Sequence, residues 1–199
     1  DSRVIGPFPA QPAPLVVRRA RGSVIEDIDG NRYLDFSAGW TDGIAGHCSP
    51  RILAAIDAQA QRLIHLCSRH FYHEPVVALA HKLEDLAPGK GPRRVVFRNS
   101  ETEVLQTAIQ IACLHKKRNI VLNLSRQVGL PALHTGILIS CQAEYGDVAA
   151  LQKKVQQQNI NWSDVAAVLV EPILSDDNLI LPPDAYLPEL KNLCDQHGI

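Results

Sequence analysis

The sequence predicts an α/β protein with a mainly parallel sheet and flanking helices, preceded by a small antiparallel β segment. Strand-like apolar runs alternate with helical apolar periodicity over the second half of the chain, which is typical of a parallel sheet. The run Val165–Val170 is apolar at every position, as expected for a parallel strand that helices cover on both faces. The spacing of Arg94–Ala112 predicts a strand that leads into a helix through a polar turn.

The antiparallel part is expected near the N-terminus. Residues 1–14 are rich in proline and are expected to form an extended arm. Leu15–Arg18 and Ser23–Asp27 alternate apolar and polar side chains, as strands do. Asp29-Gly30-Asn31 predicts a hairpin turn into a third strand over residues 32–36.

Two helices are predicted next, at Arg51–Leu66 and at Val76–Leu86, the second stopped by Pro88-Gly89. The first is amphipathic, and its expected inner face consists of Ile52, Ala55, Ile56, Gln59, Ala60, Leu63 and Ile64. Cys67, His70 and His73 between the helices invite a metal interpretation. No fourth ligand lies near them, and structural zinc needs four, so no metal site is predicted.

The stretch Arg94–Ala112 organises the middle of the chain. Val95-Val96-Phe97 is a short run of β-formers, and Glu103–Ala112 has helical spacing. Ser100, followed three residues later by Glu103, is a capping-box pattern that predicts where the helix begins. A helix N-terminus after such a turn suits a phosphate, although most turns of this kind bind nothing.

The remaining elements continue the alternation. The predicted strands are Asn119–Leu124, Ile137–Cys141 and Val165–Val170. The predicted helices are Asp147–Gln157 and Ala185–His197, the latter ending at Gly198.

The composition excludes several classes of partner. Hydrophobic residues make up 46% of the 199 residues and the formal net charge is -1, as in an ordinary soluble globular protein. No basic cluster resembles a nucleic-acid surface, and no apolar run reaches the length of a membrane helix. The five cysteines are widely spread without a C-x-x-C pair, which favours reduced thiols and a cytoplasmic protein.

Several motifs together resemble those of class III (ω-type) aminotransferases, in particular the 4-aminobutyrate and ornithine group. They are residues 19–36 (RARGSVIEDIDGNRYLDF), 39–50 (GWTDGIAGHCSP), 99–112 (NSETEVLQTAIQIA) and 165–173 (VAAVLVEPI). The resemblance implies a fold-type-I fold, pyridoxal phosphate as cofactor, a homodimer, and amino-group transfer between an amine or amino acid and a keto acid. It also implies an N-terminal arm and β segment at 1–50 and a partial large, cofactor-type α/β domain at 51–199.

The resemblance also suggests cofactor-binding residues. It places Ser100, Glu101, Thr102 and Glu103 at the phosphate group and Glu171 at the pocket floor. Glu101 stands where the family has glycine, and its carboxylate would repel a phosphate dianion. Gln127-Val128-Gly129 replaces an aromatic-His-Gly element of the family, so the cofactor ring would lack its aromatic platform.

No catalytic residue is assigned. In the family, the Schiff-base lysine and the aspartate that pairs with the pyridine nitrogen lie beyond the position of Ile199, and none of the lysines present lies in a family-like motif. The chain is therefore expected to be truncated and inactive alone. The alternatives are a non-catalytic pseudoenzyme or interaction subunit derived from the family, and a small-anion binder that uses Ser100 and Thr102.

Overall fold

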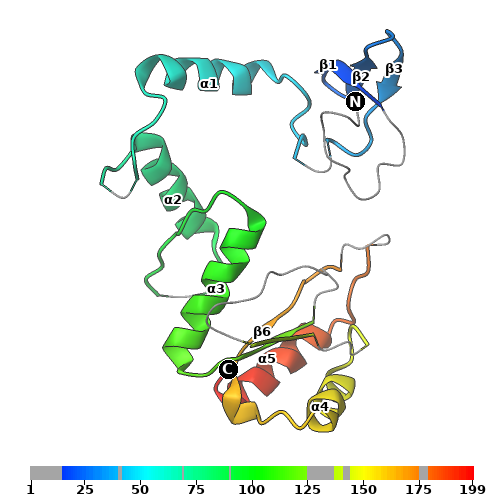
Figure 1. Cartoon of the computed structure of the whole chain (residues 1–199), viewed down its shortest axis with the longest axis vertical. Helices are drawn as coiled ribbons and strands as arrows, with labels where there is room; N and C mark the ends of the chain where they lie inside the picture. The colour runs from blue at the N-terminus through cyan, green and yellow to red at the C-terminus, as the bar shows by residue number, and fades with distance from the viewer. Residues whose placement is uncertain are drawn as a thin grey trace, which may run out of the picture. The chain divides into compact units, whose positions relative to one another are not determined.

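The computed structural model describes residues 15–39, 42–68, 70–89, 91–124, 137–140, 144–174 and 179–199, with the backbone alone for 137–140 (Figure 1). Its strands are β1 (Val17–Arg21), β2 (Val24–Asp27), β3 (Arg32–Leu34), β4 (Ile120–Asn123), β5 (Ile137–Ser140) and β6 (Val165–Leu169). Its helices are α1 (Pro50–Arg62), α2 (Glu74–Leu86), α3 (Glu101–Lys116), α4 (Val148–Gln157) and α5 (Tyr186–His197), with a short 3-10 turn η1 (Trp162–Asp164) that the sequence did not predict.

The chain forms two compact units, Asp1–Lys90 and Gly91–Ile199, called here the N-terminal unit and the C-terminal unit. The division expected at residue 50 follows the family resemblance rather than compactness, and it stays a prediction.

The N-terminal unit begins with the predicted antiparallel sheet, in the order β1-β2-β3. The hairpin turn lies where expected, and the buried carboxylate of Asp27 holds it together. This carboxylate accepts hydrogen bonds from the backbone N–H groups of Asp29 (3.0 Å) and Asn31 (2.8 Å) and from the Tyr33 hydroxyl (2.9 Å). The first strand begins at Val17, two residues later than predicted.

The helices of the N-terminal unit begin slightly earlier than predicted, at Pro50 and Glu74, and differ further in the end of α1 and in burial. α1 ends at Arg62, four residues early, because Leu63 takes an extended backbone with φ -166° and ψ 120°. The Gln59 side chain then donates to the Leu63 carbonyl at 2.9 Å. Neither α1 nor α2 buries a residue, so the expected inner face of α1 is exposed, with Ile56 at 60%. The amphipathic pattern predicts the helix but not the surface that covers it.

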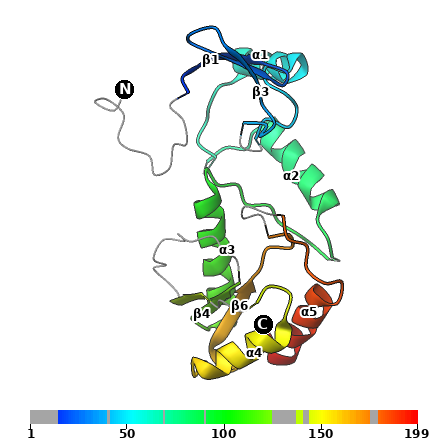
Figure 2. The ribbon, with the colours of Figure 1, turned by 90° about the vertical axis from the view of Figure 1, so that its right-hand side faces the viewer.

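The C-terminal unit contains the predicted parallel sheet, in the order β5-β4-β6. Helix α3 covers one face of the sheet, and α4 and α5 cover the other (Figure 2). The first interface buries Ile109, Cys113, Val121 and Ala166. The second buries Leu122, Leu151, Val155, Val165, Tyr186, Leu190 and Leu193. The α/β prediction is confirmed, because two apolar faces per strand require helices on both sides.

The predicted strand at Val95-Val96-Phe97 is wrong. These residues form no strand, and Val96 and Phe97 are about half exposed at 50% and 41%. β-formers alone do not make a strand, since a strand also needs a neighbour for its backbone hydrogen bonds. The following helix is longer than predicted and ends at Lys116, after which Lys117 takes the left-handed conformation with φ 54°.

Candidate functional site

The start of α3 is capped as the sequence predicts. Ser100 is the N-cap residue, and its hydroxyl oxygen accepts a hydrogen bond from the Glu103 N–H at 3.3 Å. The Glu103 carboxylate reaches back and accepts from the Asn99 N–H at 2.9 Å. In the standard capping box this carboxylate accepts from the N–H of the N-cap residue itself. Here it accepts from the N–H of Asn99, the residue before the N-cap. Glu103 is therefore occupied in closing the helix end, which argues against a direct contact with a ligand.

Glu101 and Thr102 occupy the first two positions of α3, and both are exposed. The positive end of the helix dipole and the first N–H groups favour an anion here. A cation lies close to this helix end, because Arg98 donates through Nε to the Thr107 hydroxyl at 2.9 Å and through Nη1 to the Phe97 carbonyl at 2.9 Å. The Glu101 carboxylate opposes this positive character.

The topology brings the α3 start and Glu171 to the same edge of the sheet. Helix α3 leads directly into β4 and packs on the sheet, so it runs antiparallel to the strands and begins at their carboxyl edge. Glu171 follows the last residue of β6 by two positions and lies at that edge as well. In open α/β sheets, ligands bind outside the carboxyl ends of the strands.

Asn123, the last residue of β4, is a buried polar side chain at this edge, with 4% exposure. Sequence reasoning missed it, because it stands inside an apolar run that reads as an ordinary strand. The residues expected to replace the aromatic platform, Gln127-Val128-Gly129, lie outside the described residues, as do residues 175–178.

Tyr145 fixes the backbone of the segment that carries Glu171. Its hydroxyl donates to the carbonyl oxygens of Glu171 (2.7 Å) and Pro172 (3.0 Å). Its ring meets that of Tyr186 edge to face, with centroids 5.3 Å apart. Burial and, secondly, the charge of Glu171 raise the pKa of Tyr145, so the phenol keeps the proton that it donates.

These residues fit a phosphate ester in part. The Ser100 and Thr102 hydroxyls and the helix N-terminus suit pyridoxal phosphate, and Arg98 adds positive charge nearby. The Glu101 carboxylate adds an opposing charge at the same helix end.

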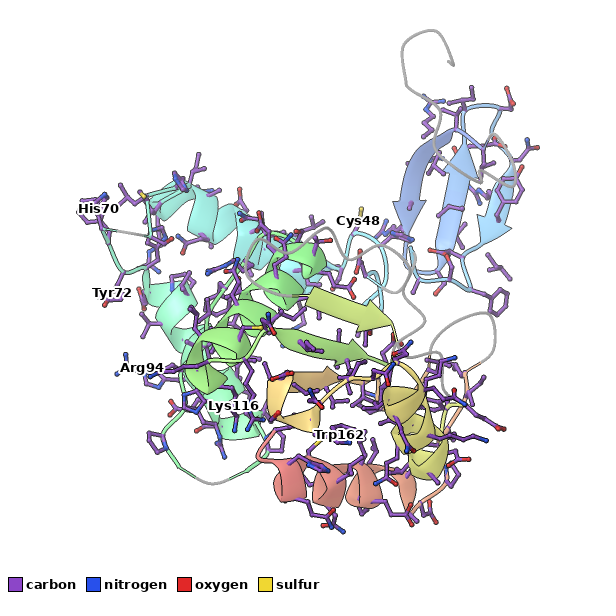
Figure 3. All side chains as sticks on the ribbon, turned by 60° about the horizontal axis from the view of Figure 1, so that its bottom comes forward. Cys48, His70, Tyr72, Arg94, Lys116 and Trp162 are labelled. Carbon is purple, nitrogen blue, oxygen red and sulfur yellow. The ribbon has the colours of Figure 1, made fainter. Side chains whose placement is uncertain are left out.

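The Cys67, His70 and His73 set does not gather. His70 and Tyr72 project from the segment between α1 and α2 (Figure 3), where Tyr72 is 96% exposed. His73 is the N-cap residue of α2, and its Nε2 is buried without a hydrogen-bond partner among the described residues. In the described part of the chain, no three His, Cys, Asp or Glu side chains are placed to hold a metal ion. No described helix is both long and apolar enough to span a membrane.

The comparisons with curated proteins point to one group of enzymes. The chain is 32% identical over 203 residues to the acetylornithine aminotransferase of Methanopyrus kandleri, covering 94% of this chain and 50% of that protein. It is 27% identical to the 4-aminobutyrate aminotransferase of Mycobacterium tuberculosis, with 94% and 49% covered. The chain therefore spans about half the length of the curated relatives it matches.

The solved structures agree. Acetylornithine aminotransferase from Elizabethkingia anophelis matches with a TM-score of 0.75 and 26% identity, covering 100% of this chain and 49% of that one. Ornithine δ-aminotransferase from Plasmodium falciparum matches with a TM-score of 0.74 and 28% identity, with 100% and 50% covered. Taurine:2-oxoglutarate aminotransferase from Bifidobacterium kashiwanohense, crystallised with pyridoxal phosphate and glutamate, shares the fold with a TM-score of 0.79 at 24% identity and 98% and 51% coverage.

The family model described as aminotransferase class-III matches residues 6–145, which is most of the chain. The relatives and the fold agree with this match, and the cofactor that it implies is pyridoxal phosphate. The chain belongs to the class III aminotransferase family.

Proposed function

We propose that this chain provides the phosphate side of a pyridoxal phosphate site in a protein that transfers amino groups. The observation that carries the proposal is the capped start of α3 at the carboxyl edge of a parallel sheet, in a chain of this family. An N-terminus of this kind offers N–H groups and a favourable dipole to a phosphate.

Each residue has a limited role in the proposed site. The Thr102 hydroxyl and N–H bind the phosphate, while Ser100 stabilises the helix end that presents them. Glu171 lies just beyond the end of β6, at the same edge of the sheet, and its proposed role is to orient the rest of the cofactor. Bound pyridoxal phosphate supplies the aldehyde and the electron-withdrawing ring that amino-group chemistry requires.

The substrates proposed are an amine or amino acid and a keto acid. The relatives are named for acetylornithine, 4-aminobutyrate and ornithine, which all carry amino groups, and this supports the class of reaction. None of the lysines of the chain lies in a family-like motif, so we propose that these 199 residues bind the cofactor without completing the reaction.

An absorbance titration with pyridoxal phosphate tests the proposal. Saturable binding is expected, and Ser100→Ala should weaken it about three- to tenfold, because it removes the cap bond that holds the phosphate-binding helix end in place. Glu101→Gly should strengthen binding, because it removes the opposing charge. Ser163→Ala, in the exposed η1 turn, is the matched control and should change nothing.

Borohydride reduction and mass analysis then show whether any lysine reacts. One labelled lysine would mean that this chain has a covalent anchor of its own. Scattered labelling of several lysines, together with saturable binding, fits the proposal of a non-covalent phosphate site. No saturable binding in the wild type would contradict it.

The second candidate is a non-catalytic relative that acts as an interaction subunit, and Glu101 in the place of a glycine favours it. Under this proposal, neither the wild type nor Glu101→Gly binds pyridoxal phosphate.

A homodimer is proposed as well, supported by the exposed apolar side chains of α1, and a monodisperse monomer in light scattering would contradict it. A cytoplasmic location is proposed because the four described cysteines are unpaired.

A further inference from the structure

We propose that Tyr145 is a positioning residue, which fixes the backbone after β6 and thereby presents Glu171 to the cofactor. The second part of this proposal, that Glu171 is presented to the cofactor, rests on the proposed function. The loop contacts themselves are independent of any cofactor.

The first step is the hydroxyl of Tyr145. It donates to two consecutive carbonyl oxygens, those of Glu171 at 2.7 Å and Pro172 at 3.0 Å. These carbonyls come directly after β6, where the strand ladder has ended and the backbone needs other partners. The single hydroxyl hydrogen is shared between them, so one side chain restrains both peptide groups.

The second step is what restrains Tyr145 itself. Its ring packs edge to face on Tyr186, which is 3% exposed at the start of α5. Gly146 follows it with φ 98°, and a Cβ there would lie 2.7 Å from Cδ of Pro183. These contacts restrain the Tyr145 ring against the start of α5. Its hydroxyl can therefore restrain the backbone that follows β6.

The position of Glu171 in the fold links this restraint to the proposed cofactor site. Glu171 lies two residues beyond β6, at the carboxyl edge where the start of α3 also lies. A group that holds the Glu171 backbone therefore controls the direction of the Glu171 side chain without contacting the cofactor. Ser100 and Thr102 lie on a different segment and do not depend on Tyr145. Loss of the tyrosine hydroxyl should therefore affect the cofactor ring and spare its phosphate.

Tyr145→Phe and Tyr186→Phe form a matched pair, because each removes one hydroxyl from the same aromatic cluster. Only the first removes a hydrogen bond to the Glu171 segment. The binding of pyridoxal phosphate and of inorganic phosphate is measured on both variants, together with backbone amide exchange of residues 171–174 and the melting temperature.

In Tyr145→Phe, amide exchange at residues 171–174 should accelerate about three- to tenfold, and pyridoxal phosphate should bind about three- to tenfold more weakly, as one lost hydrogen bond implies. Affinity for inorganic phosphate should stay within about twofold of the wild type. Tyr186→Phe should change neither the exchange at 171–174 nor the preference for pyridoxal phosphate over phosphate.

Two results would overturn the positioning role: unchanged exchange at residues 171–174 in Tyr145→Phe, or a parallel loss of both affinities with a lower melting temperature. A wild type that binds neither ligand would overturn the proposed function and with it the cofactor half of the inference. In that case the exchange data would still show whether Tyr145 holds the segment, so the two failures are distinguishable.

Discussion

The two units of the chain use similar helix patterns with opposite results. In the C-terminal unit, α3, α4 and α5 bury their apolar faces against a parallel sheet, and every described buried apolar side chain belongs to this unit. In the N-terminal unit, α1 and α2 bury no residue, and the carboxylates of Asp27 and Asp35 accept hydrogen bonds from the turn before β3 and from the segment after it. An amphipathic helix is stabilised mainly by the layer that it packs against, and only one unit supplies that layer itself.

The largest expected difference between the two units is the loss of unfolding free energy when an apolar side chain is truncated to alanine. Leu122→Ala removes a fully buried side chain of β4 and should cost about 2–5 kcal/mol of unfolding free energy. Leu53→Ala, on half-exposed α1, should cost less than about 1 kcal/mol. Urea unfolding followed by circular dichroism measures both. Equal losses would mean that α1 is covered in solution and would break the comparison.

The next effect compares two arginines. Arg118 Nη1 donates to the carbonyl oxygens of Val165 (2.9 Å) and His197 (3.1 Å), which joins the start of β6 to the end of α5. Figure 3 labels Trp162 in this region, and its ring stacks on His197 with centroids 4.8 Å apart. Arg118→Ala should therefore cost about 1.5–3 kcal/mol in thermal or urea unfolding.

Arg62 is the matched control in the N-terminal unit. It pairs with Glu74 at 3.0 Å, and both side chains are largely exposed. Arg62→Ala should cost about 0–1 kcal/mol, since solvent screens an exposed pair. A larger cost for Arg62 than for Arg118 would contradict the assignment of stability to the C-terminal unit.

A smaller effect compares helix caps. The Asp147 carboxylate accepts from the Ala150 N–H at 2.8 Å and caps α4, so Asp147→Ala should cost about 0.5–2 kcal/mol. Ser49 precedes α1 without a side-chain cap bond. Ser49→Ala should change unfolding by only about a few tenths of a kcal/mol. Differential scanning calorimetry of both variants sharpens the contrast, and equal shifts would contradict it.

The last effect appears only in acid. Hydrogen bonds lower the pKa of three described carboxyl groups in the N-terminal unit, those of Glu26, Asp27 and Asp35. Hydrogen bonds from the Ser37 side chain first, and then from His47, lower the pKa of Asp35 from 3.8 to about 2. A lowered pKa stabilises the fold above the ordinary value, and this stability is lost as pH falls through the lowered value.

The N-terminal sheet should therefore lose structure before the C-terminal unit as pH falls from about 4 to 2, the window that Asp35 sets. Carboxyl and amide NMR signals followed by pH titration measure this order. Ser37→Ala should raise the pKa of Asp35 toward its ordinary value. Simultaneous loss of both units would show that acid acts elsewhere.

Much of the fold was predictable from local patterns. The hairpin at Asp29-Gly30-Asn31 and the cap at Ser100 appear as predicted, and the parallel strand predicted at Val165–Val170 ends one residue earlier, at Leu169. Each depends on neighbours close in sequence or on burial of both faces. The strand at Val95-Val96-Phe97 and the last four residues of the first helix were wrong. Both depend on backbone partners that sequence periodicity does not reveal.

The candidate site was predictable in part. Motif resemblance located Ser100, Glu101, Thr102 and Glu103 at a helix start, and the structure shows that Glu103 serves the cap itself. The contacts of Tyr145 were not predictable, because 26 residues separate its hydroxyl from the Glu171 carbonyl that it binds.

The sequence by itself determined the family, the α/β class, the parallel strand and the caps, because apolar periodicity, turn residues and capping patterns act over a few residues. Only the tertiary structure decided which amphipathic faces are buried and which side chains hold the end of β6. Burial and long-range hydrogen bonds depend on what the folded chain brings together, and the same pattern on α1 and α4 therefore ends in exposure on one helix and in a core on the other.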